Sequence, residues 1–103
     1  MTDILIVDDE RDIRELISEI LIDEGYQTRL CGSADDCLSE LKKSVPGLLV
    51  LDIWLKDNDM DGIDILVKAK REFPQVPVVI ISGHGNIEIA VAAIKQGAYD
   101  FIE

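Results

Sequence analysis

A chain of 103 residues, 48% of them hydrophobic, is long enough for one small domain with a packed core and too short for two. Its formal net charge of −11 at pH 7 argues against direct binding to nucleic acid or to anionic membranes, which are themselves negatively charged. The acidic start lacks the basic region of a signal peptide, and the longest apolar run, residues 76–81, is far below the ~18 residues of a membrane span. We therefore expect a cytoplasmic protein.

Apolar runs of strand length alternate with helical periodicity along the first half of the chain. Residues 4–8 (ILIVD) form a continuous apolar run that ends in an acid, which is typical of a strand buried on both faces. Apolar residues at helical spacing across residues 13–21 predict an amphipathic helix that ends near Gly25. A short strand is expected near Thr28–Cys31, followed by Ser33 as the N-cap of a second helix.

The second half of the chain continues this alternation. Residues 48–52 (LLVLD) repeat the design of the first strand, with an acid again at the carboxyl end. A polar loop then leads to a helix over about residues 63–73 and to a strand over residues 78–82. Asn86 is the expected N-cap of a fourth helix that ends at Gly97, and the run AYDFI begins a fifth strand.

Alternating strands and helices indicate an α/β fold with a parallel sheet. We expect one domain over residues 1–103, with a doubly wound, flavodoxin-like sheet of five strands in the order 2-1-3-4-5 and without a fifth helix. Such sheets bind ligands beyond the carboxyl ends of the strands, between the first and third strands. Those are the two strands that end in Asp.

Three acids at these strand ends form the candidate site. Neighbouring strands lie ~4.8 Å apart, so Asp8 and Asp9 should face Asp52 across one crevice. Carboxylates this close repel one another unless a counter-ion or a proton neutralises them, and Mg²⁺ prefers such oxygen ligands. The alternative interpretation is that Asp8 and Asp9 only cap the first helix.

An ionised Asp beside Mg²⁺ can act as a nucleophile toward phosphorus. Asp52 is the candidate for that role, and Ser82 at the end of the fourth strand is placed to hydrogen-bond a phosphoryl oxygen. A strand-terminal Ser is equally often an ordinary turn residue. Cys31 and Cys37 match no redox or zinc motif and are expected to be buried free thiols.

Five segments of the sequence are spread over nearly the whole chain: ILIVDDERDIRELI, LLVLDIW, MDG before a helix, VVIISGHG and AIKQGAYDFIE. In these segments the chain resembles the receiver domain of two-component response regulators. The segments LDIWLKDNDMDG and ISGHGNIEIAV are most similar to NtrX-type sigma-54-activator regulators of nitrogen metabolism.

This resemblance implies a role for each matching residue. Asp52 would accept a phosphoryl group from a sensor histidine kinase, and Asp9 and Asp52 would bind Mg²⁺ with the backbone carbonyl of Trp54. Asp8 would act on the metal through water. Ser82 and Phe101 would be the switch residues. The expected partners are the kinase, a second copy in a homodimer, and AAA+ and DNA-binding output domains of the full-length protein.

The sequence departs from the family in two places. The loop after Asp52 begins Leu55–Lys56 in place of the usual Met-Pro start and is about two residues longer, which is expected to alter access for the kinase. The family's phosphate-contacting Lys would follow Glu103, so we expect weaker phosphate binding and a C-terminally truncated domain.

Other functions fit the sequence less well than this one. A non-phosphorylated pseudo-receiver is kept open by the expected absence of that Lys. An aspartyl-phosphate hydrolase needs a second acid two residues after the nucleophile, where this chain has Trp54. A calcium loop starting at Asp57 has Lys68 where the bidentate Glu should be, and Glu88 replaces the third glycine of a dinucleotide motif.

Overall fold

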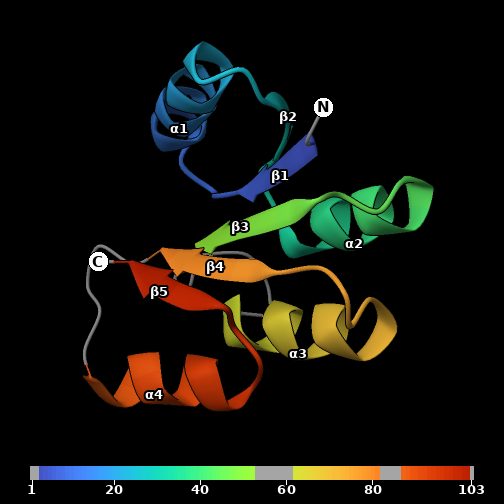
Figure 1. Ribbon diagram of the computed structural model, residues 1–103, viewed down its shortest axis with the longest axis vertical. Helices are drawn as coiled ribbons and strands as arrows, with labels where there is room; N and C mark the ends of the chain where they lie inside the picture. Colours follow the sequence, from blue (N-terminus) through green and yellow to red (C-terminus); the bar gives the residue numbers. More distant parts are fainter. Residues whose placement is uncertain (1–2, 53–61, 82–86, 103) are drawn as a thin grey trace.

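The computed structural model describes residues 3–52, 62–81 and 87–102 as strands that alternate with helices (Figure 1). None of the helices in these ranges combines the length and apolar content needed to cross a lipid bilayer. In chain order the elements are β1 (Asp3–Val7), α1 (Arg11–Asp23), β2 (Gln27–Cys31), α2 (Ala34–Lys43), β3 (Leu48–Asp52), α3 (Gly62–Glu72), β4 (Val78–Ile81), α4 (Ile87–Lys95) and β5 (Asp100–Ile102).

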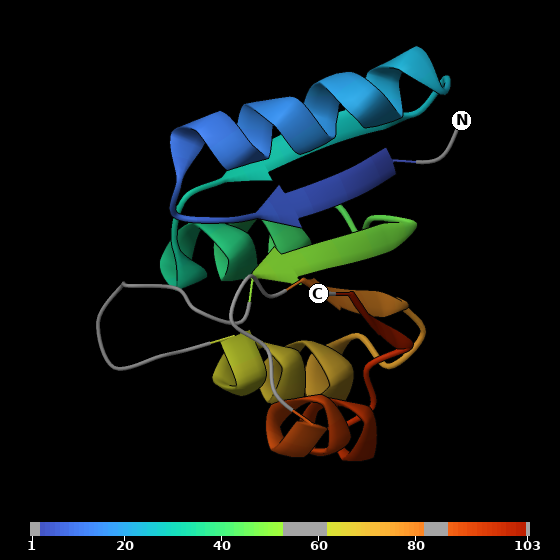
Figure 2. The same cartoon turned by 90° about the vertical axis from the view of Figure 1, so that its left-hand side faces the viewer.

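The strands form one parallel sheet in the order β2-β1-β3-β4-β5. The chain runs outward from β1 to β2 and then crosses back past β1 to β3, which makes the sheet doubly wound. Because the strands are parallel, their carboxyl ends share one edge, and Figure 2 shows the arrowheads of β1 and β3 pointing the same way. The predicted α/β flavodoxin-like class is confirmed.

Helices cover the sheet from both sides, with α1 on one side and α2 and α3 on the other (Figures 1 and 2). Alternate side chains of the central strands therefore enter two different cores, which explains why these strands are continuous apolar runs. The larger core contains strand residues Leu5, Val7, Leu49, Leu51, Val78 and Ile80 with helix residues that include Cys37, Leu41, Ile65, Leu66 and Ala93. The smaller core contains Ile4, Ile6 and Val50, with Ile17 and Leu21 of α1 packed against them.

The apolar stripe of α1 is only partly covered by the described residues. Ile17 and Leu21 pack on the sheet, whereas Leu16 and Ile20 are 54% and 55% exposed. Gly25, just after the helix, has φ of +96°, the left-handed conformation that ends helices and favours glycine. The helix and its end were thus predicted correctly, but the periodicity did not show how much of the stripe is buried.

The two thiols are free and buried, as predicted. Burial raises the pKa of Cys31 to about 11 and that of Cys37 to about 12, because an apolar environment disfavours the thiolate. Neither group is ionised near neutral pH, so both serve as small apolar side chains of the larger core.

Ser33 caps α2, because its Oγ accepts a hydrogen bond from the backbone N–H of Asp36 at 3.2 Å. We expect Ser33→Ala to lower the free energy of unfolding by about 1 kcal/mol, since this N–H loses its partner. In thermal unfolding that is a drop of about 4–8 °C for a domain of this size. Ser39→Ala, an exposed change inside the same helix, is the control. Equal melting temperatures for the two variants would contradict the capping role.

Candidate functional site

The candidate site lies at the sheet edge where β1 and β3 end. Val7 pairs with Leu51, so the next residue on each strand, Asp8 and Asp52, emerges at the same level. Asp9 follows in the turn that leads into α1. In doubly wound sheets the strand order reverses at this position, between β1 and β3, and the crevice there leaves room for ligands.

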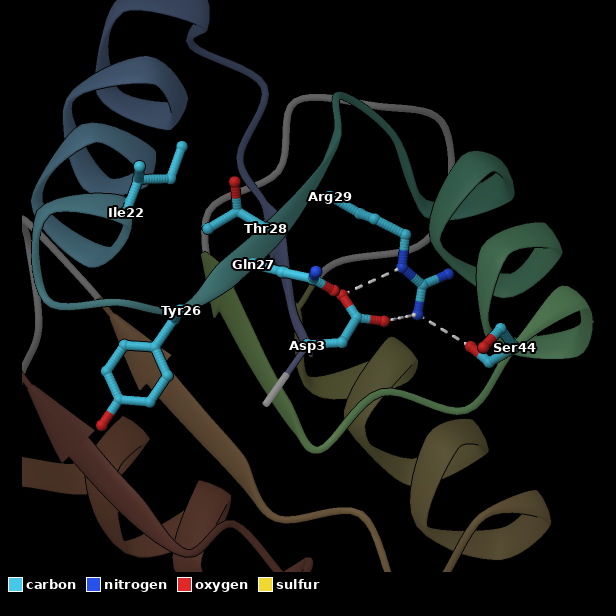
Figure 3. A pocket seen from close by; sticks show the side chains of 7 residues that line it. All are labelled: Asp3, Ile22, Tyr26, Gln27, Thr28, Arg29 and Ser44. Atoms are coloured by element: carbon cyan, nitrogen blue, oxygen red, sulfur yellow. Dashed lines mark hydrogen bonds and ion pairs between the residues drawn. The ribbon is translucent and has the colours of Figure 1, made fainter. Parts of the chain in front are cut away.

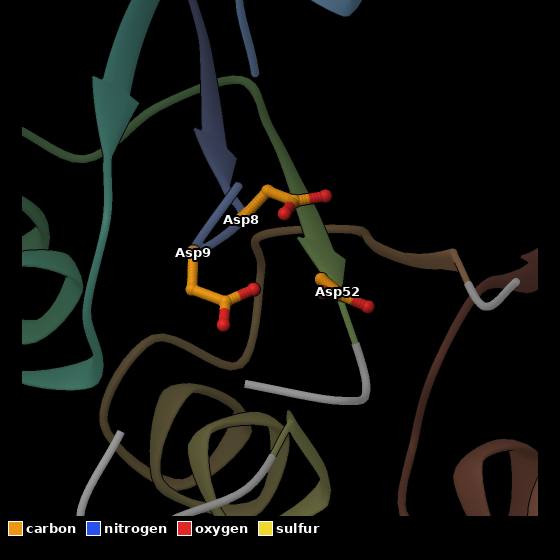
Figure 4. A group of neighbouring side chains, drawn as sticks. All are labelled: Asp8, Asp9 and Asp52. Atoms are coloured by element: carbon orange, nitrogen blue, oxygen red, sulfur yellow. The ribbon is translucent and has the colours of Figure 1, made fainter. Parts of the chain in front are cut away.

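The structure brings the three predicted acids together (Figure 4). One carboxylate oxygen from each of Asp8, Asp9 and Asp52 lies within 4.8 Å of the other two. Asp8 is buried at 6% exposure, and the other two are half-buried. At 4.8 Å two unit charges repel by about 3 kcal/mol for an effective dielectric of 20. The fold therefore holds these groups together against electrostatic repulsion.

The environment of Asp8 disfavours its ionised form. Burial raises the pKa of its carboxyl above the ordinary value, and the charges of Asp9 and Glu10 raise this pKa further. A hydrogen bond from the Glu10 backbone N–H at 2.8 Å and the charge of Arg14 act in the opposite direction without reversing the shift. The ionised form of Asp8 is thus disfavoured unless positive charge enters the site.

The donor set fits a small, hard cation. Carboxylate oxygens are the ligands that Mg²⁺ takes in proteins, usually one or two of them with water completing the shell. A divalent ion would also remove the repulsion and the burial cost described above. Among the residues that the structure describes, Asp8, Asp9 and Asp52 form the group that could hold it.

Asp8 stabilises the turn before α1 without being the N-cap residue of that helix. The N-cap of α1 is Glu10, whose side chain makes no capping hydrogen bond. Asp8 accepts a hydrogen bond from the backbone N–H of that cap residue, which stabilises the turn before the helix. The Asp8 carboxylate also belongs to the acidic cluster, so a contact with the helix start alone does not account for its position.

Several predicted site residues cannot be placed. Trp54 and Ser82 lie outside the described residues, as do His84 and the start of the rejected calcium loop at Asp57. Phe101 belongs to β5 and pairs with Ile80, but its side chain lies outside the described part of the structure. The metal-binding and switch roles of these residues stay predictions.

Two residues next to the acidic cluster were not predicted from the sequence. The Nη1 of Arg14, on α1, donates a hydrogen bond to the backbone carbonyl of Asp8 at 2.9 Å. The same guanidinium lies against Gly32, just after β2. Arg14 occupies an ordinary polar position of an amphipathic helix, so no pattern in the sequence signalled this contact.

A shallow cavity of about 580 Å³ lies where β1 and β2 begin, at the other end of these strands from the acids (Figure 3). Arg29 crosses it and forms ion pairs with Asp3 at 2.7 Å and Glu40 at 3.4 Å. Its Nη2 also donates a hydrogen bond to the carbonyl of Ser44 at 2.8 Å. The arginine is thus fully engaged in tying α2 to the sheet, which gives this cavity a structural role.

Comparison with known proteins agrees with the fold. The family model described as the response regulator receiver domain matches residues 4–103. The nitrogen assimilation regulatory protein NtrX of Azorhizobium caulinodans is 60% identical over 101 residues, which are 98% of this chain and 22% of that protein. The chain thus spans about a fifth of the length of this relative.

Two solved structures are also similar. The receiver domain of NtrX from Brucella abortus is 54% identical with a TM-score of 0.93, over 98% of this chain and 84% of that one. The beryllofluoride-activated NtrC4 receiver domain dimer is 37% identical with a TM-score of 0.91, over 100% of this chain and 84% of that one. With its doubly wound sheet and clustered acids, this chain belongs to the response regulator receiver domain family.

Proposed function

We propose that this chain is a phosphorylation-controlled receiver domain over residues 1–103 and that Asp52 accepts the phosphoryl group. The observation that carries the proposal is the convergence of Asp8, Asp9 and Asp52 within 4.8 Å at the end of the sheet. Asp52 is the last residue of β3 and is half-buried. Membership of the receiver family supports the same assignment.

In this proposal Asp9 and Asp52 would hold Mg²⁺ together with the backbone carbonyl of Trp54, and Asp8 would contribute through water. When bound, the ion neutralises charge that builds up on the transferring phosphoryl group. The role of the chain itself is to hold the Asp52 carboxylate in line with the donor. Asp8 and Asp9 raise the negative potential that attracts the cation and orient the turn beside it.

The chemical step is a transfer between two nucleophiles. A carboxylate oxygen of Asp52 forms the new P–O bond while the P–N bond of a kinase phosphohistidine breaks. The departing imidazole keeps the electron pair of that bond and takes up a proton from solvent. The product is an aspartyl phosphate, so the domain is itself modified in the reaction and serves as a signalling module.

Phosphorylation would act on the rest of the domain through a shift between two packings. The added charge would attract the Ser82 hydroxyl, and Phe101 would turn into the space that it leaves. Such a shift requires the phosphate to bind one packing more tightly than the other. The surface around α4 and β5 would then change its affinity for a partner.

The partners that we propose are those that the resemblance to receiver domains implies. They are a sensor histidine kinase, a second copy of the domain, and AAA+ and DNA-binding output domains of a longer protein. One relative is named as a nitrogen assimilation regulator, and one similar structure is an activated receiver dimer. We accordingly propose a cytoplasmic regulator of transcription in nitrogen metabolism, with no direct nucleic-acid contact by this domain because its net charge is −11.

Incubation with a small phosphodonor, with and without Mg²⁺, tests the proposal. We expect one phosphoryl adduct per chain by intact-mass spectrometry, dependent on Mg²⁺, removed by hydroxylamine and mapped to the peptide that contains Asp52. Absence of any adduct with both the small donor and a phosphorylated kinase would instead favour a pseudo-receiver. Sustained multiple-turnover hydrolysis of phosphate esters would indicate the hydrolase.

A further inference from the structure

The turn that carries the acidic cluster is held by a contact from outside the cluster. Arg14 lies one helical turn into α1, and its Nη1 reaches back to the backbone carbonyl of Asp8 at 2.9 Å. The arginine is half-buried, so this bond is partly shielded from competing water. The carbonyl that it binds joins Asp8 to Asp9, so the contact sets the orientation of the peptide between two members of the cluster.

The other polar groups of Asp8 are bound as well. Its backbone N–H donates to the carbonyl of Cys31 at 3.1 Å, which continues the pairing of β1 with β2 by one residue. Its Oδ1 accepts the N–H of Glu10 at 2.8 Å. The strand pairing and the turn thus account for two of these bonds, and Arg14 supplies the bond to the carbonyl.

Gly32 provides the space for this arginine. A Cβ built on Gly32 would lie 2.7 Å from Nη1 of Arg14, which is closer than such atoms approach, and 3.5 Å from its Cζ, which is an ordinary contact distance. Gly32 does not have a positive φ, so its lack of a side chain is not required by backbone conformation. The observed position of the guanidinium, however, does require it.

We propose that Arg14 is a positioning residue for the cation site. Gly32, because it has no side chain, leaves the space that keeps the Arg14 guanidinium on the Asp8 carbonyl. This inference rests on the proposed function, because it assumes that the acids bind Mg²⁺. The arginine acts through the backbone between Asp8 and Asp9 and sets the direction in which their carboxylates point. Arg14 orients these carboxylates although its own positive charge opposes the binding of a cation.

Gly32→Ala separates these two effects. The variant keeps every charge of the site, including that of Arg14, and only displaces the guanidinium. The displaced group is the end of a flexible side chain, so the fold should tolerate the change, and the methyl group also restricts the unfolded chain. We expect the unfolding free energy without metal to be unchanged or slightly raised, while Mg²⁺ affinity falls about three- to tenfold through loss of one charge-assisted hydrogen bond.

The test is a double-mutant cycle on Mg²⁺ affinity with the native chain, Gly32→Ala, Arg14→Ala and the double variant. Mg²⁺ titrations can be followed by calorimetry or by the fluorescence of the single tryptophan, Trp54. We expect Gly32→Ala to weaken binding in the native background and to have no effect once Arg14 is absent. Arg11→Ala removes the same charge from an exposed position on α1 and is expected to leave the affinity within about twofold.

The outcomes are distinguishable. Equal weakening by Gly32→Ala in both backgrounds would show that Gly32 acts without Arg14 and would overturn the inference. Native affinity in Gly32→Ala would overturn it as well, since the displaced guanidinium would then have no positioning role. If the native chain itself binds no Mg²⁺, the metal part of the proposed function fails and the inference fails with it. If the native chain binds Mg²⁺ and is phosphorylated on Asp52, the proposed function holds. The double-mutant cycle alone then decides whether Arg14 and Gly32 position the site.

Discussion

Asp52→Asn is expected to eliminate phosphoryl labelling of the chain, with a loss of more than roughly 10³-fold in the rate of adduct formation. An amide nitrogen and oxygen of the same shape replace the carboxylate, so the fold is retained while the nucleophilic charge is lost. The measurement is intact-mass spectrometry after incubation with a small phosphodonor and Mg²⁺. Circular dichroism confirms that the variant is folded.

The control for this experiment is Asp12→Asn, which removes one negative charge from an exposed position in the first turn of α1. It should be labelled at the native rate, because Asp12 lies outside the acidic cluster. Labelling of Asp52→Asn at the native rate would assign the nucleophile to another residue. Peptide mapping would then show whether Asp8 or Asp9 carries the phosphoryl group.

Asp8→Asn should make the metal-free domain more stable and at the same time weaken its response to Mg²⁺. The asparagine oxygen can still accept the Glu10 N–H, so the turn is kept while one buried charge and its repulsion are removed. We expect a gain of about 1–2 kcal/mol in the free energy of unfolding at pH 7, or about 4–8 °C per kcal/mol in melting temperature. Added Mg²⁺ should then raise the melting temperature less than it does in the native chain.

The pH dependence of this gain follows from the raised pKa of Asp8. At pH values between the pKa of Asp8 in the unfolded state and its higher pKa in the folded state, the folded state binds more protons than the unfolded state. The free energy of unfolding of the native chain therefore falls as pH rises through this range. The gain from Asp8→Asn should accordingly be complete above the pKa of Asp8 in the folded state and disappear below its pKa in the unfolded state. Denaturant titrations at several pH values without metal measure it, with Asp12→Asn as the control. A pH-independent difference between Asp8→Asn and the native chain would contradict the electrostatic explanation.

The sheet and the acidic cluster were predictable because local patterns and a topology rule lead to the same place. Continuous apolar runs that end in acid indicated β1 and β3, and parallel order places their ends side by side. The clustering of Asp8, Asp9 and Asp52 needs no long-range packing information beyond that rule. Each side chain simply continues a buried strand or the turn after it.

Contacts between distant elements were not predictable in the same way. The position of the Arg14 guanidinium depends on how closely the segment after β2 approaches α1. Neither Arg14 nor Gly32 stands in an unusual local sequence pattern. The network of Arg29 likewise joins β1, β2 and the end of α2. The exposure of Leu16 and Ile20 depends on which elements cover α1, which periodicity does not reveal.

The buried cysteines give the domain an internal reporter of its own opening. Cys31 and Cys37 are 3% and 0% exposed, and the high pKa of each thiol leaves almost no reactive thiolate at neutral pH. An alkylating reagent can therefore modify them only during excursions in which β2 and α2 separate. When reclosing is faster than alkylation, the modification rate measures the free energy of that excursion. The two native thiols therefore report the free energy of local unfolding without any introduced label.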